Sequence, residues 1–298
     1  MPHPSFTHYA AVDWSGASGE RHKGIAVAII GAADPMPTLV RPGHVWSRIE
    51  VLDWLLKETP PETLIGFDLG QSLAYADQGA FFPGWQDSPE TARDLWALVE
   101  AICVDEPHLG VSSFVDHPQA SRYFRRHGLR EGDLFGAEGQ PGGRGRMRVT
   151  EHAQALAGCR PTSNFNLVGA GQVGKGSLSG MRLFHRLPRE VTVWPMDPLP
   201  QKGRVVVEIY TTLAAMAAGR SAGRSKVRTR GDLAAALVAL GCQSEAVEDA
   251  DAPIADHAAD ALMTAAWLRG QAAREDLWHP STLTGKIALT EGWTFGVA

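Results

Sequence analysis

Short apolar runs that end at a polar residue or a turn alternate along this chain with stretches of helical periodicity. Tyr9–Val12 is apolar and leads into Asp13-Trp-Ser-Gly16, which predicts a buried strand followed by a turn. The runs 24–30 and 63–67 predict two further strands of the same kind. A weaker strand is predicted from 38–40 and 44–46.

A helix is predicted from Ser47 to about Lys57. Ser47 and Glu50 have the spacing of a capping box, in which each side chain accepts a hydrogen bond from the backbone of the other residue. Ile49, Leu52, Leu55 and Leu56 then fall on one face. The order of strand, strand, strand, helix and strand favours an α/β fold with a mixed sheet.

The pattern changes between about residues 70 and 190, where Gly and Pro are frequent and no strong strand is predicted. We expect helices near 90–102 and 118–127 and a loop at 136–145. We interpret the segment as a long insertion in a single domain that spans residues 1–298. After it, strands are predicted at 191–194 and 204–210 and helices at 212–218, 231–240 and 254–275.

The composition is typical of a globular protein with a sizeable core, because 44% of the 298 residues are hydrophobic and 20% are charged. The formal net charge of −5 argues against a uniformly basic nucleic-acid-binding protein. Cys103, Cys159 and Cys242 form no C-x-x-C pair, which makes a cysteine zinc site improbable. No signal peptide or membrane-spanning run of about 18 apolar residues is present, so we expect a cytoplasmic protein without membrane contact.

Acidic residues stand at or directly after three of the predicted strands. Asp13 follows Val12, Asp68 follows Phe67, and Glu208 lies within the run 204–210. Each of these carboxylates alone has an ordinary alternative role, which is to cap the next helix or to hold a turn. Their repetition on separate strands favours a shared site.

The last predicted helix carries Asp256, His257 and Asp260. Asp256 and Asp260 are four residues apart and His257 and Asp260 are three apart, so these side chains are neighbours on the helix surface. Asp256 also suits the helix N-terminus, where the helix dipole favours an anion. Asp260 lies further in, among alanines and Leu262, where its charge needs a partner.

Converging carboxylates require a cation or protons. Two carboxylates about 5 Å apart repel each other by roughly 3 kcal/mol at an effective dielectric constant near 20. Hard oxygen ligands suit Mg²⁺ or Mn²⁺, and two such ions can support phosphodiester hydrolysis. We therefore expect Asp13, Asp68, Glu208 and Asp260 to be catalytic metal ligands, with His257 or Asp256 as further ligands.

The order of these elements resembles the ribonuclease-H-like superfamily. Val12-Asp-Trp-Ser-Gly16 is similar to its first metal-binding strand, and Asp256-His-Ala-Ala-Asp260 resembles the terminal helix of Holliday-junction resolvases. Three motifs, Gly66-Phe-Asp-Leu69, Val207-Glu-Ile-Tyr210 and Asp260-Ala-Leu262, resemble an uncharacterised bacterial family of predicted ribonuclease-H-like nucleases. The resemblance covers the outer thirds of the chain. It implies a metal-dependent nuclease and leaves open whether Asp68 or Glu208 is the ligand that is often Glu in the resolvases.

Gly169-Ala-Gly-Gln-Val-Gly174 fits the G-x-G-x-x-G pattern of a dinucleotide-binding loop. The strand predicted before it is short, and Gly176 stands where a phosphate loop would need a hydroxyl residue. An ordinary turn at a helix N-terminus, NAD binding and nucleoside-triphosphate binding all stay open. A further reading is that backbone N–H groups and Lys175 bind a substrate phosphate.

Two basic stretches, 122–148 and 220–230, contrast with the negative net charge. Such segregated charge is typical of phosphate-binding surfaces and also of solvated loops. From these stretches we predict Arg146, Arg148 and Lys226 as contacts to substrate phosphates.

The sequence thus predicts a nuclease that uses Mg²⁺ or Mn²⁺ and acts on DNA or RNA. Two alternatives stay open: an ATP-dependent phosphotransferase or ATPase of the actin-like branch, and an inactive nucleic-acid-binding module.

Overall fold

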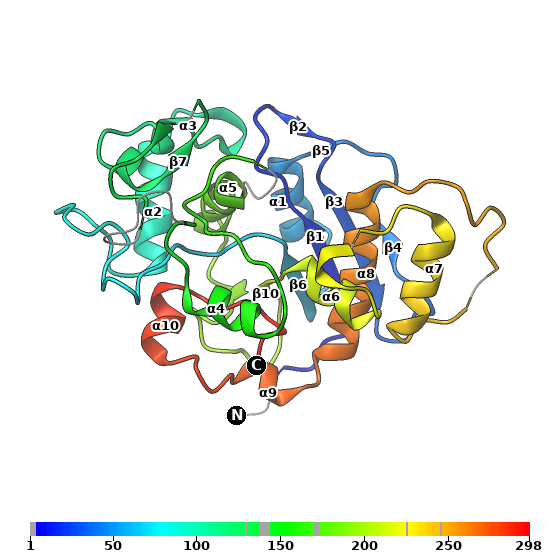
Figure 1. Ribbon diagram of the computed structural model, residues 1–298. Helices are drawn as coiled ribbons and strands as arrows, with labels where there is room; N and C mark the ends of the chain where they lie inside the picture. The colour runs from blue at the N-terminus through cyan, green and yellow to red at the C-terminus, as the bar shows by residue number, and fades with distance from the viewer. Residues whose placement is uncertain (1–3, 129, 137–143, 170–172, 225, 245) are drawn as a thin grey trace.

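A mixed six-stranded sheet forms the centre of the computed structural model (Figure 1). The structure describes residues 4–128, 130–136, 144–169, 173–224, 226–244 and 246–298. The strand order is β4-β3-β1-β6-β10-β9. The strands are β1 (His8–Asp13), β3 (Ala26–Gly31), β4 (Thr38–Leu39), β6 (Thr63–Phe67), β9 (Thr192–Val193) and β10 (Val205–Glu208).

The strand directions divide the sheet into two parts. β3 runs antiparallel to both β1 and β4, whereas β1, β6, β10 and β9 are parallel to one another. The carboxyl ends of β1, β6 and β10 therefore lie at one edge of the sheet. The prediction of an α/β fold with a mixed sheet is confirmed.

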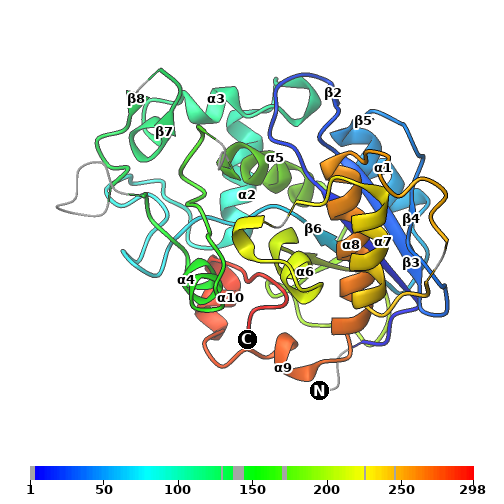
Figure 2. The ribbon, with the colours of Figure 1, turned by 45° about the vertical axis from the view of Figure 1, so that its right-hand side comes forward.

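Helices cover both faces of the sheet (Figures 1 and 2). One face packs against α8 (Asp256–Gln271), with α6 (Thr211–Ala217) and α7 (Arg230–Ala239) beside it. The other face shares its apolar core with α1 (Arg48–Lys57), α2 (Ala92–Ile102) and α5 (Val173–His185). The two apolar cores follow from the buried strands, whose side chains alternate between the faces.

The helices flanking the sheet begin close to where the sequence predicts them. Ser47 caps α1 and forms the complete capping box with Glu50. The alanine-rich α8 buries every side chain from Ala259 to Leu268, because it lies between the sheet and its neighbouring helices. The predicted helices 47–57, 212–218, 231–240 and 254–275 are confirmed to within a few residues at each end.

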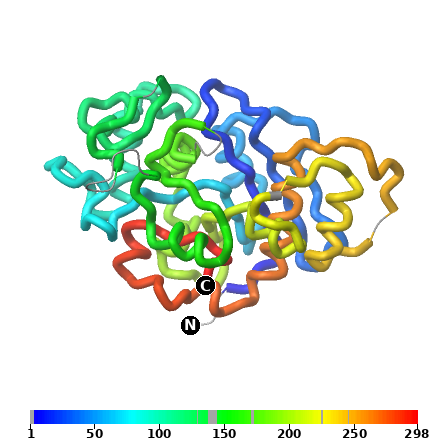
Figure 3. The backbone as a smooth tube through the Cα atoms, in the orientation of Figure 1, coloured from blue at the N-terminus to red at the C-terminus, as the bar shows by residue number. Residues whose placement is uncertain are grey.

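The segment between residues 70 and 190 wraps the side of the sheet away from α7 and α8, shown in cyan to green in Figure 3. The helix predicted at 118–127 is wrong, because a 3₁₀ turn and a small hairpin occupy this range. Most of the loop predicted at 136–145 lies outside the described residues. Besides α2 and α5, the segment contains 3₁₀ helices Pro107–Leu109 and Ala120–Tyr123, α3 (Ser112–Val115), β7 (Arg125–Arg126), β8 (Arg130–Glu131) and α4 (Val149–Leu156).

The weak strand predicted from 38–40 and 44–46 is divided between two sheets. β4 extends the main sheet, whereas β5 (Trp46–Ser47) pairs with β2 (Arg21–His22). In the described part of the chain, no helix is both long and apolar enough to span a membrane. The remaining helices are the 3₁₀ helix Ala222–Arg224, α9 (Glu275–Trp278) and α10 (Gly285–Thr290).

Candidate functional site: a carboxylate cluster beside a cleft

Asp13 and Asp68 stand side by side at the carboxyl ends of β1 and β6. Val12 is paired in register with Phe67, and the N–H of Asp68 donates to the carbonyl oxygen of Val12 over 3.0 Å. The next residues, Asp13 and Asp68, are therefore level with each other. Since side chains alternate along a strand, both carboxylates belong to the sheet face that α8 covers.

α8 brings two more polar side chains to this face. His257 lies in its first turn, and its Nδ1 is 2.8 Å from Oδ2 of Asp13. Asp260 follows one turn later and is buried, with 4% of its surface exposed. The i, i+3 spacing makes His257 and Asp260 neighbours on α8, and the contact of His257 with Asp13 brings this part of the helix to the end of β1.

Each carboxylate of this cluster has a protein partner. Lys226 donates from Nζ to Oδ2 of Asp260 over 2.5 Å, and Thr211 donates from Oγ1 to Oδ2 of Asp68 over 3.2 Å. Lys226 belongs to the segment between α6 and α7, and Thr211 begins α6. We refer to Asp13, Asp68, Asp260, His257 and Lys226 below as the carboxylate cluster.

The charges in the cluster influence one another strongly. Desolvation, followed by the negative charges of Asp13 and Asp260, raises the pKa of Asp68 to about 8. Desolvation also raises the pKa of Asp260, although Lys226 opposes this shift. The hydrogen bond to Asp13 raises the pKa of His257. Desolvation alone would lower the pKa of Lys226, but Asp260 raises it overall. These are the signs of a site with an excess of closely spaced negative charge.

Asp256, the other predicted ligand on α8, is the first residue of the helix and is partly exposed. Its negative charge contributes to the raised pKa values of Asp260 and Lys226. Among the residues that the structure describes, no three His, Cys, Asp or Glu side chains are arranged to hold one metal ion. The partners named above account for this: Asp13 is turned to His257 and Asp260 to Lys226.

Glu208 lines the same cleft as Asp68, but its side chain is paired with residues outside the cluster, unlike the single grouping expected from the sequence. Glu208 is paired in register with Phe67, one position before Asp68, so its side chain belongs to the opposite face of the sheet. Both of its oxygens are occupied. They accept from both terminal nitrogens of Arg148, at 2.6 and 2.8 Å, from the N–H of Gln71 and from the hydroxyl of Thr294.

Arg148 is a buried structural cation rather than a surface contact to phosphate. Its side chain is 2% exposed and binds Glu208 and Glu151 together, while Nη1 also donates to the carbonyl oxygen of Glu291. The attraction of these two carboxylates raises the pKa of Arg148 although burial acts against it. A buried cation with two carboxylate partners fastens α4 to the end of β10 and leaves no free donor for a substrate.

The other predicted arginine contacts are also engaged within the protein. The side chain of Arg146 is 1% exposed, binds Asp77 and donates to the carbonyl oxygens of Ala74, Ala80 and Phe81. Arginines at 122, 125 and 126 form ion pairs with Asp133, Glu131 and Asp116. The stretch 122–148 is therefore largely neutralised from within.

A cleft of about 660 Å³ opens beside the cluster. Its lining includes Asp68, His257 and Lys226 of the cluster, together with Arg160 and Asn164. The first turn of α5 borders the cleft through Val173 and Gly176, and the indole of Trp14 fastens this turn by donating to the carbonyl oxygen of Gly176. Clefts of this size, lined by convergent polar groups, are typical of ligand sites.

Lys175 lies between Val173 and Gly176 in the first turn of α5 and is partly exposed. The glycine loop before it, 169–174, includes residues 170–172, which lie outside the described residues. The backbone of the turn approaches the loop after β1 closely, because a Cβ on Gly16 would meet the nitrogen of Gly176 at 2.4 Å. The first turn of α5 is thus held against the loop after β1, at the border of the cleft.

Two residues that the sequence analysis overlooked support the cluster. Arg48 is 3% exposed and donates to the carbonyl oxygens of Ser15 and Ala17, which holds the loop that follows Asp13. A lone arginine in line with the apolar Val51 and Leu55 of α1 is the signal for this buried role. Thr211 donates to Asp68, and its position as the first residue of α6, three positions after the end of β10, gives only a weak signal.

Comparison of the whole chain with protein-family models, with curated proteins and with solved structures gives no match in any of the three.

Proposed function

We propose that this chain is a ribonuclease-H-like, metal-dependent nuclease that hydrolyses phosphodiester bonds at the carboxylate cluster. The strand order and directions support the fold assignment: three antiparallel strands continue into parallel strands, with the acids at the ends of β1 and β6. The observation that carries the proposal is the level arrangement of Asp13 and Asp68 at the ends of β1 and β6, with Asp260 of α8 on the same face and Asp68 at the wall of a cleft.

The donor set fits a hard divalent cation. Asp13, Asp68 and Asp260 would hold Mg²⁺ or Mn²⁺ through carboxylate oxygens, the ligands these ions prefer. Burial, and after it the neighbouring negative charges, raises the pKa of both Asp68 and Asp260, and a bound cation would offset both effects. The bound ion would supply Lewis-acid stabilisation of the negative charge that develops on phosphate oxygens during hydrolysis.

The side chains around the cluster are suited to a phosphate substrate. Lys226 is half exposed at the cleft and would bind a non-bridging phosphate oxygen once it leaves Asp260. His257 fixes the orientation of Asp13 through their hydrogen bond. The positive end of the α5 helix dipole favours an anion, although the N–H of Gly174 in this turn already donates to the carbonyl oxygen of Asn166. Lys175 adds a positive charge in the same turn.

Cleavage assays with matched variants test this function. We expect the wild-type protein with Mn²⁺ or Mg²⁺ to cleave at least one of single-stranded, duplex or branched DNA or RNA. Asp13→Asn and Asp260→Asn should reduce the rate at least a hundredfold, because each removes a ligand charge. The surface variant Asp276→Asn, which removes an exposed carboxylate, should cleave like wild type. Equal background rates for wild type and Asp13→Asn on every substrate would contradict a nuclease.

The same assays separate the alternatives. Metal-dependent turnover of ATP without cleavage of nucleic acid would favour a phosphotransferase or ATPase. Salt-sensitive binding of nucleic acid without any turnover would favour an inactive binding module.

A further inference from the structure

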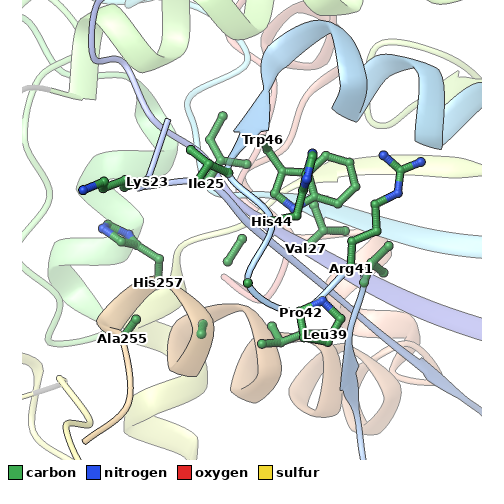
Figure 4. A pocket seen from close by; sticks show the side chains of 15 residues that line it. Lys23, Ile25, Val27, Leu39, Arg41, Pro42, His44, Trp46, Ala255 and His257 are labelled. Atoms are coloured by element: carbon green, nitrogen blue, oxygen red, sulfur yellow. The ribbon is translucent and has the colours of Figure 1, made fainter. Parts of the chain in front are cut away.

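A second, smaller pocket, shown in Figure 4, shares His257 with the cleft. It has a volume of about 250 Å³. His257 lines both the pocket and the cleft. The chain from Lys23 to Ile25 also passes between them, because Gly24 lines the cleft whereas its two neighbours line the pocket. The pocket is thus one side chain away from Asp13.

The chemistry of the pocket combines an apolar floor with a cationic rim. Ile25, Val27 and Leu39 come from the sheet region, and Ala258 comes from α8. Figure 4 shows Lys23 and His257 at one end of the pocket and Arg41, His44 and Trp46 at the other. None of the residues that line it is Asp or Glu. Such a lining suits a flat, largely apolar ligand that carries negative charge.

The two ends of the pocket differ in their available charge. Arg41 lies 4.9 Å from the centre of the Trp46 ring and is paired with Glu58, and His44 binds Glu50. The His44 ring meets the Trp46 ring edge to face, with centroids 5.1 Å apart, so this end of the pocket is a packed cluster whose charges are already paired. Lys23 is exposed and has no ion-pair partner in the described part of the chain. The free positive charge therefore lies at the end nearest the carboxylate cluster.

The volume of the pocket matches a single nucleic-acid base. A pocket of about 250 Å³ lies below the range on the order of 300–1,000 Å³ that is usual for drug-sized ligands, so it suits a single base rather than a base pair. Apolar and aromatic walls hold bases by stacking and contact, and an enzyme that takes one base into a pocket must receive it unpaired. The phosphate attached to that base would then lie toward Lys23 and His257.

We infer that this pocket receives the unpaired base of the nucleotide next to the phosphate on which the carboxylate cluster acts, so that the substrate class is single-stranded nucleic acid. This inference rests on the proposed nuclease function. It goes beyond that function by requiring an unpaired nucleotide in DNA or RNA at the site of cleavage.

Binding of short fluorescein-labelled oligonucleotides, followed by anisotropy in EDTA, tests the pocket without cleavage. One abasic residue is moved through the oligonucleotide, in DNA and RNA versions. For wild type, removal of the base at one position should weaken binding about tenfold, in keeping with the contribution of one base contact. In Ala258→Phe, whose larger side chain fills the pocket, the intact oligonucleotide should bind about tenfold more weakly and the abasic position should lose its effect.

A charge variant provides an independent arm. Lys23→Glu should weaken binding of intact and abasic oligonucleotides alike, because it acts on the phosphate. Arg189→Glu, which makes the same change of charge at an exposed position before β9, should have a much smaller effect. If Ala258→Phe does not fold, the abasic scan of the wild-type protein and the Lys23→Glu variant still test whether the pocket binds a base.

Different results would contradict the base-binding pocket and the proposed nuclease function. The inference is overturned if no single position is sensitive to base removal, if Ala258→Phe retains the wild-type sensitivity, or if the oligonucleotides do not bind. Cleavage with Mn²⁺ is measured in parallel. Cleavage without a position that is sensitive to base removal would contradict the base-binding pocket and support the nuclease function. A sensitive position without cleavage of any substrate would contradict the nuclease function and support a base-binding site.

Discussion

Nδ1 of His257 lies 2.8 Å from Oδ2 of Asp13, although 244 positions separate the two residues in the chain. Asp260 is held in a similar way by Lys226. Two of the three carboxylates that we assign to a divalent cation are therefore engaged by side chains that carry or accept a proton. A cation that binds there competes with these partners, which makes the competition measurable.

Removing the ammonium group of Lys226 should strengthen metal binding. Because Lys226 is half exposed, its pairing with Asp260 is worth roughly 0.5–1 kcal/mol, so Lys226→Gln should bind Mn²⁺ about two- to fivefold more tightly. Isothermal titration calorimetry with Mn²⁺ measures this change. Lys202→Gln, which removes a more exposed lysine near Glu62, serves as the control and should bind Mn²⁺ like wild type. Unchanged or weaker binding by Lys226→Gln would show that a cation does not compete with Lys226 for Asp260.

Glu208 and Asp68 should respond differently to loss of charge. Glu208→Gln leaves the buried Arg148 without one of its two carboxylate partners, and breaking a buried pair typically costs about 3–5 kcal/mol. Asp68→Asn instead replaces a carboxyl group whose pKa of about 8 keeps it largely protonated at neutral pH, so we expect a change within about 1 kcal/mol. Urea unfolding of the metal-free proteins compares the two free energies of unfolding. Equal values for Glu208→Gln and wild type would contradict the structural role of this ion pair.

The close approach of Gly16 to the first turn of α5 predicts a cost for the smallest possible side chain. A Cβ at position 16 would meet backbone atoms of Lys175 and Gly176, which cannot move aside as a flexible side chain can. We expect Gly16→Ala to lower the free energy of unfolding by about 1–3 kcal/mol. Gly270→Ala is the matched control, since a Cβ there meets nothing within 4 Å and alanine favours a helix by up to about 1 kcal/mol. Thermal denaturation should give Gly16→Ala the lowest midpoint, wild type a higher one, and Gly270→Ala a midpoint equal to or above that of wild type.

His22 should make stability depend on pH. Burial, with the nearby positive charge of Arg48, lowers its pKa to about 4 from an ordinary value of 6.5. Between about pH 6.5 and pH 4, His22 therefore binds a proton in the unfolded chain but not in the folded protein. Stability is complete above about pH 6.5 and is lost as the pH falls toward 4. Between about pH 7.5 and about pH 4.5, the free energy of unfolding should fall by about 2 kcal/mol more for wild type than for His22→Gln.

Urea unfolding at both pH values measures this difference between the two proteins. His22→Gln serves as the reference for wild type, because the two proteins have all other titrating groups in common. A parallel loss of stability in wild type and His22→Gln would mean that His22 titrates alike in the folded and unfolded states.

Local features of the sequence determined the elements around the site. Apolar runs specified β1, β3 and β6, and the capping box of Ser47 and Glu50 specified the start of α1. The spacing of His257 and Asp260 put both on neighbouring positions of one helix. These predictions succeed because strand alternation, helix periodicity and capping depend on residues only a few positions apart.

The tertiary structure alone decided which polar residues meet. Glu208 pairs with Phe67 and so lies one position out of line with Asp68, and this offset places it on the other face of the sheet. Arg146 and Arg148 find carboxylate partners 69 and 60 positions away, which removes them from the surface. Lys226 comes to Asp260 from 34 positions away. Strand register and long-range pairing depend on how distant segments pack, and the local pattern of polar and apolar residues contains no record of them.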